Sequence, residues 1–268
     1  MANSRVHVLP RTAAHSPNHV AAQHHWTLNT AILSHTSPSG RALRIAVVEN
    51  SQTPAGAVLV LPGGKPVSTA RSRPWQLANL RMALLGAAIR QRLPAATVSR
   101  IRYRLRGWNA PELDPVRDAE AALDGLLERF APEQIVVVGH SMGGRVAAHL
   151  AGRREVGGVV ALAPWWPAAD ADLVPVGTRL LTMHGTADTW TDPASSRLQC
   201  LRAAERGVDA DWVGLPDAGH YMLRRWRTWH TLTAEFAYEQ LTGFGSDNGG
   251  NPQHNEKNQR AGDLPEPG

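Results

Sequence analysis

The feature that most constrains the fold is a glycine-flanked serine that directly follows an apolar run. Residues 135–138 are Ile-Val-Val-Val, residues 139–143 are Gly-His-Ser-Met-Gly, and a stretch compatible with a helix comes next. A serine on such a tight strand-to-helix turn holds a strained backbone, and the positions two before and two after it must be small. Gly139 and Gly143 meet this requirement. The pattern therefore predicts a sharp turn that presents Ser141 as a candidate nucleophile.

Short apolar runs alternate with longer stretches of helical spacing through the middle of the chain. This alternation is typical of a mostly parallel sheet with helices on both faces, so we predict an α/β fold with about eight strands. The first two strands are expected to form an antiparallel hairpin. The predicted strands cover residues 27–35, 42–49, 57–62, 97–103, 134–139, 158–163, 179–184 and 210–215, and the predicted helices cover residues 75–92, 115–130, 142–152, 193–206 and 226–241.

One domain is expected, over residues 26–241, with a polar segment at each end. Residues 1–25 and 242–268 lack apolar periodicity and are rich in polar residues, so both are predicted to be disordered. The stretch between Ala163 and Arg179 is too short for a separate lid domain. We therefore expect a site that is open to solvent.

Charge and cysteine content exclude several classes of protein. The net charge is +5, but the arginines are scattered, with no basic helix, nucleic-acid motif or aromatic stacking signature. A nucleic-acid partner is therefore not expected. Cys200 is the only cysteine, which excludes an intrachain disulfide and a cysteine-based metal site. The first thirty residues hold no apolar run that resembles a signal-peptide core, and no segment approaches the length needed to span a bilayer, so we predict a cytoplasmic protein.

A candidate acid follows the predicted strand at residues 179–184. Residues 179–185 are expected to form a strand that ends in a glycine turn, and Asp188 lies three residues beyond that glycine. Ligands bind at the carboxyl ends of strands in open α/β sheets, and a carboxylate there can orient an imidazole. Asp192, directly before Pro193, is the alternative acid, but its position is more typical of a helix cap.

A candidate base follows the last predicted strand. Residues 217–221 are Asp-Ala-Gly-His-Tyr, and His220 is the only histidine in a loop that follows the acid strand. Such a loop can bring an imidazole over the sheet toward Ser141. The oxyanion that forms on a substrate carbonyl needs backbone N–H donors. Met142, at the helix start, is one candidate, and the glycine loop after residue 61 supplies the other, Gly64 as first choice and Lys65 as second.

These motifs together resemble the alpha/beta-hydrolase superfamily over about residues 27–241. Within it the chain is similar to lidless serine hydrolases, which include esterases, lipase-like and dienelactone-hydrolase-like proteins. The serine nucleophile departs from strict dienelactone hydrolases, haloalkane dehalogenases and epoxide hydrolases, and Pro62 stands where many relatives carry a histidine. The matching segments are residues 58–64, 138–144, 184–188 and 218–220. The resemblance implies Ser141 as nucleophile, Asp188 as acid, His220 as base, and the amides of Met142 and Gly64 as the oxyanion hole.

Five aromatic residues are expected at the same sheet edge and are candidates for an apolar substrate wall, although each one taken singly is as well explained by loop packing. They are Trp108, Trp165, Trp166, Trp190 and Tyr221. We predict a serine hydrolase that cleaves small to medium hydrophobic esters through an acyl-enzyme, without metal or organic cofactor. Acyl transfer, thioester or amide cleavage, and a non-catalytic binding role are the alternatives. The physiological substrate and the oligomeric state are left open.

Overall fold

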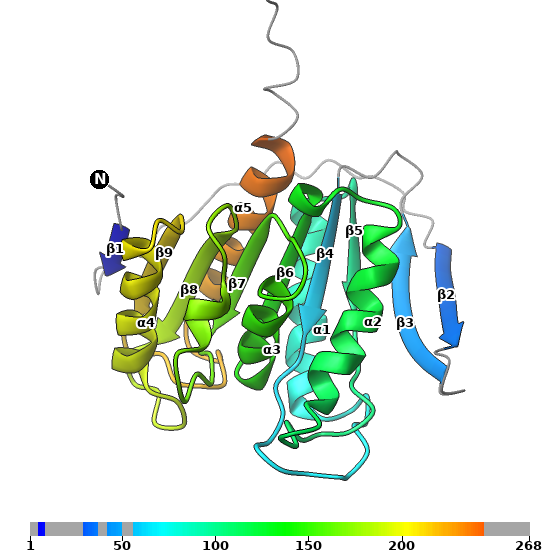
Figure 1. The fold of residues 1–268 in the computed structure, drawn as a ribbon, viewed down its shortest axis with the longest axis horizontal. Coiled ribbons are helices and arrows are strands. Elements are labelled where there is room, and N and C mark those ends of the chain that lie inside the picture. The colour runs from blue at the N-terminus through cyan, green and yellow to red at the C-terminus, as the bar shows by residue number, and fades with distance from the viewer. Residues whose placement is uncertain (1–4, 9–28, 37–41, 50–55, 244–268) are drawn as a thin grey trace, which may run out of the picture.

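The computed structural model describes residues 5–8, 29–36, 42–49 and 56–243. Within these ranges the strands form one sheet in the order β1-β9-β8-β7-β6-β4-β5-β3-β2 (Figure 1). β3 alone runs in the opposite direction to the other strands, so the predicted mostly parallel sheet is confirmed. The strands are β1 (Arg5–Val8), β2 (Asn29–Thr36), β3 (Ala42–Glu49), β4 (Gly56–Leu61), β5 (Ala96–Arg100), β6 (Ile135–His140), β7 (Gly158–Leu162), β8 (Arg179–Gly185) and β9 (Ala210–Leu215).

The two ends of the sheet differ in how well the sequence predicts them. The expected opening hairpin is present, because β2 and β3 pair antiparallel over their full length. At the other end, residues 5–8 form β1 and pair in parallel with β9, so the prediction of disorder is wrong for this segment. A strand this short carries almost no periodicity, and β9 offers the unpaired backbone groups that it needs. Residues 242 and 243, predicted as the start of the second disordered segment, are the end of a helix, and residues 1–4, 9–25 and 244–268 lie outside the described residues.

Helices cover both faces of the sheet, as predicted (Figure 1). Alternate residues of the central strands point to opposite faces: Leu59 and Val137 join one buried cluster, and Val58 and Val136 join the other. Each such buried side chain contributes about 1.5–3 kcal/mol of transfer free energy. Side chains of α2 (Asp114–Leu127), α3 (Met142–Ala151) and α4 (Pro193–Glu205) belong to the first cluster, and those of α1 (Leu77–Arg92) and α5 (Trp226–Gly243) to the second.

The loops at the carboxyl ends of the parallel strands are short. Between β7 and β8 the chain forms only one 3-10 turn, Asp170–Leu173, and no separate lid domain. The loops that follow β4, β6, β8 and β9 emerge along the same edge of the sheet, at the bottom of Figure 1. Over the ranges given above, no helix combines the length and the apolar character that a membrane crossing requires.

Candidate active site

The turn between β6 and α3 has the strained geometry that its sequence predicts. Ser141 adopts the backbone angles φ 57° and ψ −118°, which residues other than glycine rarely adopt. A Cβ on Gly139 would lie 2.0 Å from the carbonyl oxygen of Gly143, and one on Gly143 would lie 2.4 Å from that of Leu61. No real Cβ sits so close to backbone, so both glycines are required for β6, β4 and the start of α3 to meet.

The structure brings together the three residues of the predicted triad. Ser141 Oγ lies 3.0 Å from His220 Nε2, and His220 Nδ1 lies 2.8 Å from Asp188 Oδ2. They come from the loops that follow β6, β9 and β8, respectively. Asp188 and His220 are buried. The alternative acid, Asp192, instead caps α4, because its carboxylate accepts a hydrogen bond from the N–H of Ala194 at 2.9 Å.

The Asp188 carboxylate is held by donors on both oxygens. Its Oδ1 accepts the N–H groups of Trp190 at 2.8 Å and of Thr191 at 3.0 Å, and its Oδ2 accepts the Thr191 hydroxyl at 2.8 Å. Burial alone raises the pKa of this carboxyl, but hydrogen bonds from two imidazoles and two backbone N–H groups outweigh burial. The pKa of Asp188 is therefore held well below its ordinary value, and the group is ionised at neutral pH.

A second histidine, which the sequence analysis placed inside a strand and did not select, also contacts this carboxylate. His184, at the end of β8, is fully buried. Its Nε2 lies 3.1 Å from Asp188 Oδ2, and its Nδ1 lies 2.8 Å from Ser196 Oγ. Asp188 Oδ2 thus faces the imidazoles of both His184 and His220. The only sequence signal was the spacing of His184 four residues before Asp188.

The histidine before the serine was missed as well. His140 Nε2 lies 2.8 Å from the backbone carbonyl oxygen of His220, so this nitrogen carries a hydrogen and donates it. Burial, and after it the electrostatic effect of the neighbouring His220 ring and of the Arg81 guanidinium, lower the pKa of His140 well below its ordinary value. His140 is therefore neutral, and its hydrogen bond ties the loop that carries His220 to the end of β6.

The glycine loop after β4 lies against the start of α3. Met142 is the first residue of α3, so its N–H has no acceptor within the helix. A Cβ on Gly64 would lie 2.3 Å from the Met142 side chain, which shows how closely the two segments approach. The Lys65 N–H is already used, because it donates to the carbonyl oxygen of Arg106 at 2.8 Å. This geometry favours Gly64 over Lys65 as the second oxyanion donor.

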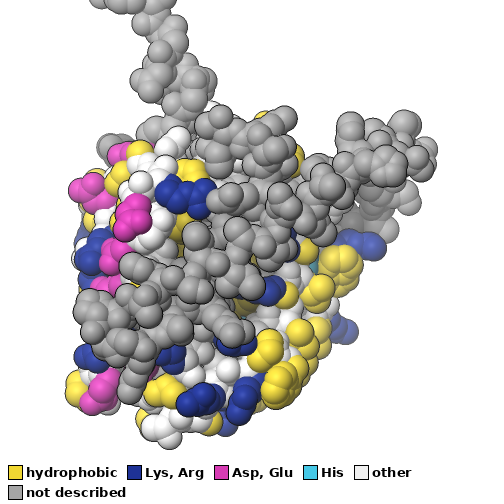
Figure 2. Space-filling model, turned by 90° about the vertical axis from the view of Figure 1, so that its right-hand side faces the viewer, with side chains coloured by type: hydrophobic (Ala, Val, Ile, Leu, Met, Phe, Trp, Pro, Cys, Tyr) yellow, Lys and Arg dark blue, Asp and Glu magenta, His cyan; other side chains and the backbone are white. Residues whose placement is uncertain are grey.

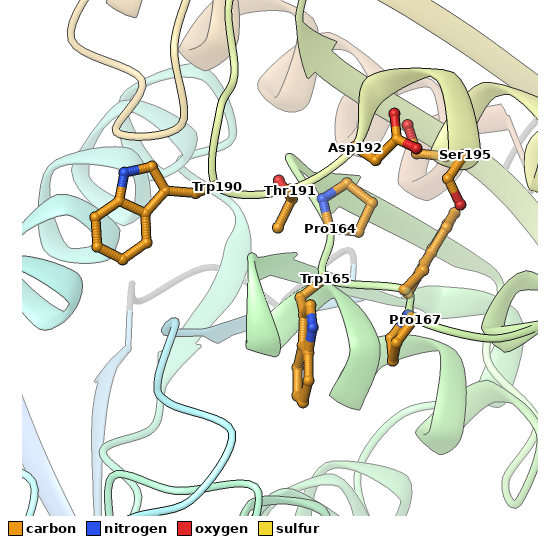
Figure 3. Close-up of a pocket in the computed structure, with 9 residues that line it drawn as sticks. Pro164, Trp165, Pro167, Trp190, Thr191, Asp192 and Ser195 are labelled. Carbon is orange, nitrogen blue, oxygen red and sulfur yellow. The ribbon is translucent and has the colours of Figure 1, made fainter.

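The five predicted aromatic residues divide into two groups. Trp165, Trp166 and Trp190 line a cavity of about 290 Å³ between the loop after β7 and the start of α4 (Figure 3). Tyr221 lies outside this cavity, with its ring centroid 5.6 Å from that of Trp190. Trp108 is buried behind Trp165, edge-on to it at 6.1 Å, and does not line the cavity. The other lining residues are Pro164, Pro167, Thr191, Asp192, Ser195 and Ser196.

Comparison with known proteins agrees with the fold. The model of the Alpha/beta hydrolase family matches residues 58–247, and this chain therefore belongs to that family. A comparison with curated proteins found no match.

Solved structures of similar fold include carboxyl esterase 2 from the mycorrhizal fungus Tuber melanosporum, at 16% identity and a TM-score of 0.62 over 80% of this chain and 88% of that one. An alpha-beta serine hydrolase homologue from Coxiella burnetii is 15% identical, with a TM-score of 0.59 over 79% and 99% of the two chains. An alpha/beta hydrolase enzyme from a Medee basin deep-sea metagenome library is 18% identical, with a TM-score of 0.60 over 80% and 98%. At these identities the similarity shows the fold alone.

Proposed function

We propose that this protein is a serine hydrolase that cleaves carboxylic esters through a covalent acyl-enzyme. The observation that carries the proposal is the unbroken line of contacts from Ser141 Oγ through the His220 ring to Asp188, at 3.0 Å and 2.8 Å. Nucleophile, base and orienting acid at these distances are the signature of an activated serine. The presence of a carboxyl esterase and a serine hydrolase homologue among proteins of the same fold supports this class.

In the first half of the reaction, His220 Nε2 takes the proton of the Ser141 hydroxyl while Oγ attacks the ester carbonyl carbon. Asp188 accepts a hydrogen bond from Nδ1–H of the ring and stabilises the imidazolium that forms. The ring then gives its proton to the departing alcohol, which leaves an acyl group on Oγ. In the second half, water loses a proton to the same nitrogen, attacks the acyl carbon and releases the acid with free Ser141.

The oxyanion of each tetrahedral intermediate is stabilised by backbone donors. In this proposal they are the N–H of Met142, at the start of α3, and the N–H of Gly64 in the loop that packs on Met142. A donor of this kind is worth about 3 kcal/mol when it meets the developing charge in a site sheltered from water. The positive end of the α3 dipole acts in the same direction.

The cavity beside the triad supports a hydrophobic ester of modest size. The Trp165 N–H donates to the carbonyl oxygen of Ser141 at 3.0 Å, so the cavity shares a wall with the serine turn. Thr191 joins the cavity to the acid, since its hydroxyl bonds Asp188. A volume of about 290 Å³ is at the small end of the range for ligand pockets and suits a short acyl or alcohol group.

A panel of p-nitrophenyl esters with increasing acyl length tests the proposal. We expect kcat/KM to be highest for short and medium chains, and Trp165→Ala to move the optimum to longer chains because it enlarges the cavity. Val176→Ala, which truncates an exposed side chain outside the cavity, is the matched control and keeps the original optimum. If the protein cleaves a thioester or an amide but none of the esters, the proposed substrate class is wrong.

His184 offers a test of how the acid is held. Loss of a hydrogen bond to a charged group costs about 1.5–3 kcal/mol, so we expect His184→Leu to lower kcat about 10- to 100-fold. KM changes little, because His184 is buried behind Asp188 and lines no part of the cavity. His184→Gln keeps a donor and recovers part of kcat. Steady-state kinetics measure both values, and a rise in KM at constant kcat would contradict this role.

A further inference from the structure

Exposed apolar side chains surround the candidate triad on one side. Leu223 is 76% exposed and Trp190 is 71% exposed, and Tyr221 and Trp226 are also on the surface. Two of them contact the candidate base: the Trp190 ring stacks against His220 with centroids 6.2 Å apart, and the Tyr221 ring lies 5.7 Å from His220. Leu223 and Trp226 follow Tyr221 within five residues of the chain. Single exposed apolar residues are ordinary, but a contiguous group beside a catalytic centre indicates an interaction surface.

Helix α1 extends this group. Leu77, Leu80 and Leu84 lie at helical spacing on its outer side and are exposed, whereas Leu85 and Ile89 are buried against the sheet. A surface helix normally has one apolar face, and α1 has two. The stripe adjoins the aromatic residues, because the guanidinium of Arg81, from the same helix, lies 5.1 Å from the centre of the Tyr221 ring.

We call this set the rim surface. It consists of Leu77, Leu80, Leu84, Trp190, Tyr221, Leu223 and Trp226.

Charge is distributed unevenly around the rim surface. Every Asp, Glu, Lys or Arg between residues 56 and 111 is a Lys or Arg, and the same holds between residues 218 and 234. These two segments supply all of the rim surface except Trp190. Figure 2 shows hydrophobic and basic side chains together on the lower right of the molecule, with the acidic side chains on the opposite, left side.

Three arginines lie next to the rim surface, and two of them are exposed. Arg225 anchors the loop, because its Nε donates to the carbonyl oxygen of Pro216 at 2.6 Å. Arg224 and Arg227 are exposed, and Arg224 Nη1 also donates a long hydrogen bond of 3.4 Å to the carbonyl oxygen of Asp217. Arg227 lies 5.0 Å from the Trp226 ring, so a cation sits directly beside an apolar side chain that protrudes into solvent.

We propose that the rim surface binds the surface of an anionic phospholipid bilayer and so brings the triad to esters held in lipid; this rests on the proposed function. Leucine and tryptophan enter the boundary between headgroups and acyl chains, and arginines pair with lipid phosphates. Apart from Trp190, which also borders the cavity beside the triad, these side chains protrude from the surface and line no part of that cavity. A lipid surface accommodates such protrusions without a complementary pocket, whereas a protein partner would need one, and leucines add nothing to the binding of a nucleic acid backbone.

The test is cosedimentation of the full chain with phosphatidylcholine vesicles, with and without phosphatidylglycerol. We expect binding to the anionic vesicles that weakens with added salt. Leu223→Ser with Trp226→Ser weakens it at least about tenfold, since two apolar anchors are lost. Arg224→Gln and Arg227→Gln each weaken it about fivefold. Leu198→Ser with Val176→Ser, at exposed apolar positions outside the rim, is the matched control and leaves binding unchanged.

Activity gives a second readout. The Leu223/Trp226 double variant keeps wild-type turnover of a soluble short ester, which also shows that it is folded, and loses turnover of an ester embedded in anionic vesicles. Failure of wild type to bind anionic vesicles, or equal binding by the double variant, overturns the proposal. The proposal is also overturned if the rim surface binds an oligonucleotide, or a second copy of this chain, and does not bind vesicles. Cosedimentation of the Ser141→Ala protein separates the two proposals, because it reports lipid binding even if no ester is cleaved.

Discussion

Ser141→Ala is expected to abolish turnover of p-nitrophenyl esters and labelling by a fluorophosphonate. The nucleophile of a triad acts as a unit with its base, and its removal costs on the order of 10⁶ in kcat. The fold is kept, because alanine retains the Cβ and loses only the Oγ that contacts His220. Rates of ester hydrolysis and gel-based labelling measure the effect.

Two controls sharpen this result. Ser72→Ala removes a serine hydroxyl that bonds Asn79 away from the site and keeps full labelling. In the double variant Ser141→Ala/His220→Ala, the rate falls no further than in Ser141→Ala alone, because the base has nothing left to activate. Retained labelling in Ser141→Ala, or additive losses in the double variant, would rule out Ser141 as the nucleophile.

Gly139→Ala is expected to have the largest effect on stability. Its new methyl group would lie 2.0 Å from the carbonyl oxygen of Gly143, and the neighbouring atoms are backbone, which cannot rotate away. We expect the free energy of unfolding to fall by more than about 3 kcal/mol, since both overpacking and backbone strain result. Urea unfolding followed by circular dichroism measures it.

Gly125→Ala is the matched control for this substitution. Gly125 lies in α2, and a Cβ there meets no atom within 4 Å. The same chemical change therefore stabilises the protein by about 0.5–1 kcal/mol, because alanine is the better helix former. A Gly139→Ala protein as stable and active as the wild type would show that β6 and α3 do not meet as described.

The family fold could be predicted because its signals are local. The valine-rich run before Gly139 marks a buried strand, and the two glycines around Ser141 mark a turn that few other folds need. Helix spacing in residues 115–127 and the strand at 158–162 are equally local. The prediction of an alpha/beta-hydrolase fold with helices on both faces is therefore confirmed.

The contacts that complete the candidate site depend on residues far apart in the chain. Whether Lys65 or Gly64 faces the substrate depends on the Arg106 carbonyl, which the sequence cannot place beside that loop. The contact of His140 with the His220 carbonyl joins β6 to the loop after β9. The triad itself stays a prediction, which the geometry supports and the variants above test.

The hydrogen bond from His140 to the His220 carbonyl has a mechanical consequence. His140 and Ser141 are consecutive, and both contact His220. His140 Nε2 lies 2.8 Å from the His220 carbonyl oxygen, and Ser141 Oγ lies 3.0 Å from His220 Nε2. Two strands, β7 and β8, separate β6 from β9 in the sheet. Twisting of the sheet would pull the serine and the imidazole apart if they were joined only through those strands. Because this dipeptide contacts the loop after β9 directly, the approach of Ser141 to His220 is held by a route that bypasses β7 and β8.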